Sequence, residues 1–275
     1  MKIILLCGDQ PNQIALANKV SHEFNLVGIV IEKRPSKKIS EIKVKQLFIK
    51  VLDRIVFKKI HQTWKNLLNY YFNNFSAFPK TETITVSNIN SEGTISFINK
   101  LQPDLIMVSG TDLIKNKILS LPIKNGIINL HTGLSPYIKG GPNCTNWCLA
   151  TRQYQYIGNT IMWIDAGIDS GALITTEQTP LNGNESFEEI HIKVMDHAHE
   201  LYLRSLRQIE KDKSNVPSAL QSSITTGTTY FTKDWNLKAR WKLFQSISSN
   251  HFRKNFNSEK FAQLKKEVKT VSLPL

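Results

Sequence analysis

Short apolar runs alternate with segments of helical periodicity along the first three quarters of the chain. The apolar runs lie at 2–7, 26–31, 83–86, 105–108, 126–129, 157–164 and 172–177. Apolar residues at helical spacing predict helices over 14–24, from 91 to about 100, around Trp147, and from Ser186 to about 209. Strands that alternate with helices in this way predict an α/β fold with a mostly parallel, twisted sheet.

Residues 33–78 interrupt this alternation and predict a basic helical insertion. Between Lys33 and Lys65 there are 11 basic residues against two acidic ones. Apolar residues recur at helical spacing over 44–55, and an aromatic-rich segment continues the pattern to Phe78. We expect the apolar side to pack on the sheet and the basic face to stay solvated. Contact with RNA or with a membrane surface is the alternative interpretation.

Residues 211–275 differ in composition and predict a basic C-terminal extension to a catalytic domain at 1–210. From Lys233 onward there are 10 basic residues against three acidic ones. Residues 227–235 indicate a short extended segment that leads into a helix. The extension suits either a dimer element, which would make the protein a homodimer, or a basic arm.

Polar side chains follow two of the apolar runs at the points where they end. Alternation along a strand puts Asn129 and His131 on the same face, and the run at 157–164 stops before a loop that contains Asp169. In open parallel sheets, ligands bind at the carboxyl ends of the strands. An amide, an imidazole and a carboxylate there suit acyl transfer to an amine. A strand-end cap beside a satisfied buried histidine is the alternative.

The spacing of these residues resembles that of the folate-dependent formyltransferases. The chain carries Asn-x-His, then x-x-Leu-x-Pro and a glycine, then a strand that ends in Asp-x-Gly-x-Asp-x-Gly at 165–171. The resemblance covers roughly residues 1–210. It implies a Rossmann-like formyltransferase domain that uses N10-formyltetrahydrofolate as formyl donor. It also implies catalytic roles for Asn129, His131 and Asp169.

The same resemblance implies two groups of binding residues. Those expected to contact the folate are Gly110, Leu113, Ile164, Asp165 and Gly167. Those expected to contact the acceptor substrate are Gly8, Asn12, Gly133 and Ser135. The turn at 8–13 would hold a substrate phosphate at a helix start, although an ordinary tight turn explains it equally well. After His131 the chain reads Thr-Gly-Leu-Ser-Pro where the family usually has Pro-Ser-Leu-Leu-Pro or Gly-Ser-Leu-Leu-Pro. This departure leaves the identity of the acceptor substrate undetermined.

A primary amine on a nucleotide-linked amino sugar is the acceptor that we expect. The phosphate turn matches the purine-pathway relatives only at Gly8 and Asn12, and the tail is short for the C-terminal barrel of tRNA-directed relatives. The alternatives are a methionyl-tRNA or glycinamide ribonucleotide formyltransferase, a formyltetrahydrofolate hydrolase, and a non-catalytic RNA-binding module.

Composition restricts these alternatives only in part. The net charge of +13 would attract nucleic acid, a membrane surface or a small polyanion equally.

Three cysteines form no disulfide framework and indicate a reducing, cytoplasmic location, and we expect Cys144 and Cys148 to serve packing. We expect no metal site. No apolar run approaches the roughly 20 residues of a membrane span, and the apolar N-terminus predicts a buried strand rather than a signal peptide.

Overall fold

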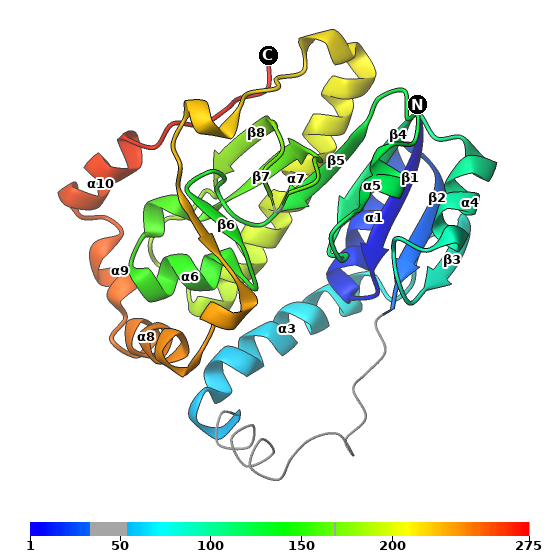
Figure 1. Cartoon of the computed structure of the whole chain (residues 1–275). Coiled ribbons are helices and arrows are strands. Elements are labelled where there is room, and N and C mark those ends of the chain that lie inside the picture. The colour runs from blue at the N-terminus through cyan, green and yellow to red at the C-terminus, as the bar shows by residue number, and fades with distance from the viewer. Residues whose placement is uncertain (34–53, 168, 275) are drawn as a thin grey trace.

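Seven strands form one sheet at the centre of the protein (Figure 1). The structure is a computed structural model that describes residues 1–33, 54–167 and 169–274. The strand order is β3-β2-β1-β4-β5-β7-β8. Neighbours from β3 to β5 pair in parallel, and β7 runs antiparallel to both β5 and β8. The predicted α/β fold with a mostly parallel sheet is therefore confirmed.

The observed elements follow the predicted ones closely. The strands of the large sheet are β1 (Lys2–Gly8), β2 (Asn25–Glu32), β3 (Glu82–Val86), β4 (Leu105–Ser109), β5 (Ile127–His131), β7 (Gly158–Trp163) and β8 (Leu173–Gln178). The helices are α1 (Pro11–Glu23), α3 (Lys58–Asn74), α4 (Glu92–Leu101), α5 (Asn116–Leu119), α6 (Cys144–Thr151), α7 (Phe187–Asp212), α8 (Leu237–Ser248), α9 (His251–Asn255) and α10 (Glu259–Lys266). A second, two-stranded sheet pairs β6 (Ile138–Gly140) with β9 (Thr228–Tyr230).

Alternation along the strands divides the core into two layers. Ile3 and Leu5 of β1 face α1 and α7, whereas Ile4 and Leu6 face α4 and α5. Both layers are buried, which explains why the central strands read as continuous apolar runs instead of alternating with polar residues. Loops follow the carboxyl ends of β1, β4 and β5, and they carry polar residues such as Asp9, Asp112 and Thr132.

Helix α3 is the described part of the predicted insertion. Its buried residues Leu67 and Tyr71 pack against Ala15 of α1 and Met195 of α7. The expectation that the insertion packs on the sheet is therefore wrong for this part, because α1 and α7 already cover that face. The pattern over 44–55 lies almost wholly outside the described residues.

The C-terminal residues are joined to the rest of the protein by backbone hydrogen bonds. Strand β9 pairs in parallel with β6, and Thr176 of β8 donates its N–H to the carbonyl of Val271 at 2.8 Å. Helix α8 packs against α6, so that α8, α9 and α10 lie beside α6 and away from β3 (Figure 1). The extended segment and helix predicted after 227 are present as β9 and α8. The division of the chain at 210 stays a prediction.

Strands β4 and β5 stop pairing at Val108 and Asn129, and a side chain from α7 bridges them there. The fully buried Tyr202 hydroxyl accepts a hydrogen bond from the N–H of Val108 at 3.0 Å and donates to the carbonyl of Ile128 at 2.9 Å. This bridge ties α7 to the two strand ends next to Asn129. Without the hydroxyl, these buried hydrogen bonds between α7 and the sheet would be lost.

We expect Tyr202→Phe to lower the free energy of unfolding by about 1–1.5 kcal/mol, because the variant loses buried hydrogen bonds to the backbone. Urea denaturation monitored by circular dichroism measures this change. Tyr156→Phe is the matched control, because the Tyr156 ring stacks on Tyr137 while its hydroxyl bonds to no residue that the structure describes; it should change stability by less than ~0.5 kcal/mol. Equal effects of the two substitutions would contradict the bridging role.

Candidate active site

The three residues predicted to be catalytic meet at the carboxyl end of β5. Asp169 lies in the loop between β7 and β8, and one of its carboxylate oxygens is 3.3 Å from Nδ1 of His131. The amide of Asn129 donates to the other carboxylate oxygen at 3.5 Å. Both partners of the ion pair are nearly buried, with side-chain exposures of 10% for His131 and 15% for Asp169. An amide, an imidazole and a carboxylate therefore form one group, as the spacing predicts.

Gly140 and Cys144 close a ring of contacts around this ion pair. The N–H of Gly140 donates to the Asp169 carboxylate at 3.0 Å. The Cys144 thiol lies 3.4 Å from Nε2 of His131 and donates to the carbonyl of Gly140 at 3.5 Å. Burial raises the pKa of this thiol, so it keeps its proton for Gly140, and its sulfur can accept from Nε2. Both ring nitrogens of His131 are thus placed to donate.

The charges around His131 favour its protonated, positively charged form. Burial by itself lowers the pKa of His131, but the Asp169 carboxylate and, to a smaller extent, Cys144 outweigh it and raise the pKa to about 9. Because this pKa lies above the ordinary 6.5, the pair stabilises the fold fully below about pH 6.5, and the contribution disappears as the pH rises through about 9. A shift of this size corresponds to about 3 kcal/mol.

Several residues that the sequence did not predict hold the contacts around His131 and Asp169 in place. Gln221, from the C-terminal extension, donates to the carbonyls of Asp169 at 2.7 Å and Gly171 at 2.9 Å. Thr160 of β7 donates to the carbonyl of Gly133 at 2.7 Å and so anchors the loop after His131. Cys144, expected to serve packing alone, contacts His131. No local pattern marks these side chains, since each acts on a residue at least 13 positions away.

A cavity of about 230 Å³ opens beside Asn129 and Asp169. All five residues predicted to contact the folate line it, namely Gly110, Leu113, Ile164, Asp165 and Gly167. Leu113 is 48% exposed at this cavity, and Asp165 shapes its loop by accepting hydrogen bonds from the N–H of Gly167 and the hydroxyl of Ser170. His131 does not line the cavity and lies behind Asp169.

The four residues predicted to contact the acceptor lie outside this cavity. A Cβ atom on Gly8 would come within 3.1 Å of the carbonyl of Gly110, and one on Gly133 would clash with Nε2 of His131. Asn12 and Ser135 are buried, at 3% and 1% exposure. Their side-chain oxygens form no hydrogen bond with any residue that the structure describes. Gly8 and Gly133 thus allow close packing around the site, and the acceptor roles stay predictions.

Within 1–33, 54–167 and 169–274, no group of three or more His, Cys, Asp or Glu side chains is arranged to hold a metal ion. The three cysteines are free and buried. Among the helices in these ranges, none has the length and apolar character needed to cross a membrane.

Comparison with known proteins gives a family match and several relatives. The sequence model described as "Formyl transferase" matches residues 13–206. Methionyl-tRNA formyltransferase from Clostridium tetani is 32% identical over 119 residues, which are 43% of this chain and 37% of that protein. The protein of the same name from Syntrophus aciditrophicus is 29% identical over 166 residues, 60% of this chain and 52% of that protein. The chain spans about half or less of the length of these curated relatives.

Solved structures share the fold at low sequence identity. A 4-N formyltransferase from Francisella tularensis superposes with a TM-score of 0.57 and 17% identity, covering 89% of this chain and 87% of that one. Phosphoribosylglycinamide formyltransferase from Bacillus halodurans superposes with a TM-score of 0.52 and 15% identity, covering 78% of this chain and 98% of that one. These likenesses establish the fold.

We expect Asp169→Asn to lower the pKa of His131 from about 9 to below its ordinary 6.5, because burial then acts without the opposing carboxylate. Titration of the histidine ring protons by NMR measures the change. His191 and His199 are internal controls, since burial already lowers their pKa values to about 4 and about 3 and Asp169 contributes to neither. A His131 pKa that stays near its wild-type value in the variant would show that Asp169 is not the cause.

Proposed function

Because this chain belongs to the formyl transferase family, we propose that it transfers a formyl group from N10-formyltetrahydrofolate to a primary amine. One observation carries the proposal: Asn129 and the ion-paired Asp169 both line the cavity whose walls contain every residue expected to contact the folate. The family match makes the chemistry plausible, and this arrangement supplies the groups that the chemistry needs.

The cavity suits the ring of a folate better than an entire ligand. Its volume of about 230 Å³ is below the roughly 300–1,000 Å³ of sites that enclose a drug-sized molecule. Apolar side chains line it at Val108, Leu113 and Ile164, and a flat heterocycle would cover the exposed part of Leu113. The rest of the donor would then lie outside, with the formyl group beside Asn129.

The transfer breaks one bond to the formyl carbon and forms another. The acceptor nitrogen bonds to that carbon, the bond to N10 breaks, the amine loses a proton and N10 gains one. Nδ2 of Asn129 would donate a hydrogen bond to the formyl oxygen as it gains negative charge. The charged His131, paired with Asp169, would offset the negative charge of that carboxylate, which would otherwise oppose the charge developing on the formyl oxygen.

Asp169 would provide the route for the proton. Nδ1 of His131 faces the Asp169 carboxylate, and Nε2 faces Cys144, so neither ring nitrogen reaches the cavity directly. The proton of the attacking amine would therefore pass to the Asp169 carboxylate, directly or through a water, with His131 as its partner. His131 would thus act on this proton through Asp169.

An amine on a nucleotide-linked sugar is the acceptor that we favour. The likeness to the 4-N formyltransferase from Francisella tularensis extends over 89% of the chain and so includes much of the C-terminal region. In this region, residues 211–274 form mainly helices, whereas tRNA-directed relatives would be expected to place a barrel after the catalytic domain. Methionyl-tRNA is the second candidate, because the curated relatives reported above carry that name.

We expect Asn129→Ala to leave the fold intact and to lower kcat by ~10²–10³, the usual effect of removing one oxyanion donor. The assay follows formyl transfer from N10-formyltetrahydrofolate to the amine. Asn184→Ala is the matched control, because Asn184 is exposed and does not line the cavity beside Asn129. Near-full turnover by the Asn129 variant would remove that residue from the mechanism.

A panel of acceptors tests the substrate class. We expect formylated product with at least one nucleotide-linked amino sugar and none with glycinamide ribonucleotide or charged initiator tRNA. Formylated product with the tRNA alone would show that methionyl-tRNA, the second candidate, is the acceptor instead of an amino sugar. Formate release that needs no amine would instead identify a hydrolase, and steeply salt-dependent RNA retention without folate binding would identify an RNA-binding module.

A further inference from the structure

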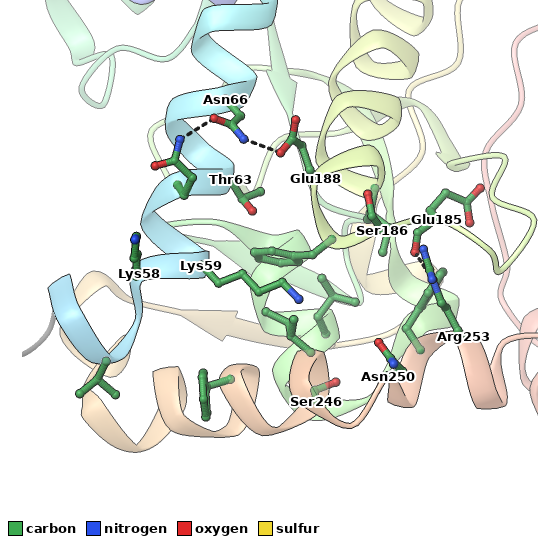
Figure 2. A pocket seen from close by; sticks show the side chains of 18 residues that line it. Lys58, Lys59, Thr63, Asn66, Glu185, Ser186, Glu188, Ser246, Asn250 and Arg253 are labelled. Atoms are coloured by element: carbon green, nitrogen blue, oxygen red, sulfur yellow. Dashed lines mark hydrogen bonds between the residues drawn. The ribbon is translucent and has the colours of Figure 1, made fainter.

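A second cavity, of about 710 Å³, lies between α3, the start of α7 and the C-terminal helices α8 and α9 (Figure 2). It shares no lining residue with the cavity beside Asn129. Its wall from α8 and α9 lies beyond the family match at 13–206. The folate chemistry of the family therefore gives this cavity no role.

The inner wall of the second cavity is apolar and rich in aromatic rings. Side chains from α6, α7, α8 and α9 contribute Leu149, Phe187, Ile190, Phe244, Ile247 and Phe252. A cavity of this size falls within the roughly 300–1,000 Å³ range of small-molecule sites, which are mostly apolar with a few polar groups. The lining therefore suits the apolar body of an organic molecule.

Three cationic side chains line this cavity, namely Lys58, Lys59 and Arg253. Lys58 and Lys59 are exposed and form no ion pair with any residue that the structure describes. Arg253 uses its Nε to donate to the carbonyl of Glu185 at 3.2 Å. Figure 2 shows the Lys59 side chain extending over the cavity from α3, with Arg253 at the opposite side beside Glu185.

The two carboxylates of the cavity are already satisfied. Glu185 is 4% exposed, accepts from Lys193 at 2.7 Å and also accepts from the N–H groups of Asn182 and Gly183. Glu188 accepts from the amide of Asn66 at 2.6 Å. Neither carboxylate forms an ion pair with Lys58 or Lys59, so within the part of the chain that the structure describes both lysines remain available to a bound anion.

The start of α7 does not supply the anion site. Ser186 caps it by accepting from the N–H of Glu189, and the Glu189 side chain accepts from the N–H of Ser186 in return. This capping box already satisfies the helix end, and the acidic residues of the first turn oppose a second anion. Lysine and arginine side chains remain as the groups able to hold one.

We infer that this cavity binds a small amphipathic organic anion, whose apolar body lies against the aromatic wall and whose phosphate or carboxylate is held by Lys59. The inference is independent of the proposed formyl transfer, because it rests on residues that take no part in that site. A ligand bound here would contact α3, α7 and α8 at once and so connect the insertion to the C-terminal region.

Octyl phosphate, octanoate and octyl glucoside test the inference with the full chain. The three share one alkyl chain and differ in head group, so their affinities separate the contribution of the charge from that of the apolar wall. Displacement of the fluorescent anion 1-anilinonaphthalene-8-sulfonate gives the affinities. We expect one or both of the anions to bind about tenfold or more tightly than the neutral glucoside, and this preference to weaken at high salt.

Matched lysine substitutions on one helix locate the site. Lys59→Gln removes the charge and keeps a polar side chain only one atom shorter, and we expect it to weaken binding of the preferred anion about tenfold. Lys65→Gln is the control, because Lys65 is exposed on the same helix and does not line the cavity. It should bind as the wild type does, with circular dichroism showing that both variants are folded.

Three results would overturn the inference. One is equal affinity for the glucoside and both anions, which would leave only an apolar site. Another is equal loss of affinity in the Lys59 and Lys65 variants, which would indicate general attraction to a basic surface. The third is no saturable binding of any probe by the folded protein.

Discussion

The buried ion pair between His131 and Asp169 imposes the strictest constraint on this structure. Two charges held away from water are costly unless they pair closely and their remaining hydrogen-bonding groups find partners. Here the partners are Asn129, Gly140 and Cys144, which come from β5, β6 and α6. The pair therefore requires that these separate segments are positioned together with correct geometry. A displacement of any of them would also displace the Asp169 carboxylate, which borders the cavity.

The C-terminal region is tied to this ion pair more directly than its composition suggests. Gln221 binds the backbone on both sides of the Asp169 turn, where Asp169 itself adopts a left-handed conformation with φ of 47°. Strand β9 pairs with β6 and so supports Gly140, and α8 packs on α6, which carries Cys144. The region after residue 211 thus supports the backbone of the candidate active site and also forms part of the second cavity.

The two cavities differ in the physical character of their walls. The one at the carboxyl edge of the sheet is small and is bordered by the carboxylates of Asp112, Asp165 and Asp169 together with backbone groups of two loops. Such walls match the hydrogen-bond donors of a flat heterocycle. The one between the helices is larger, with an aromatic wall and lysines beside it. A net charge of +13 is therefore a poor guide to either site, because local pairing decides which charges remain available.

Sequence periodicity determined the layered α/β fold, because strands buried on both faces must be apolar throughout and their covering helices must carry an apolar stripe. The motif spacing placed Asn129 and His131 on one strand face and Asp169 at the end of another, and the folate-contact residues follow from the same resemblance. Only the tertiary structure decided that α3 packs on helices instead of the sheet, that Cys144 and Gln221 reach the site, and that His131 lies behind Asp169. Those facts depend on contacts between distant segments, and the local sequence of either partner carries no signal for them.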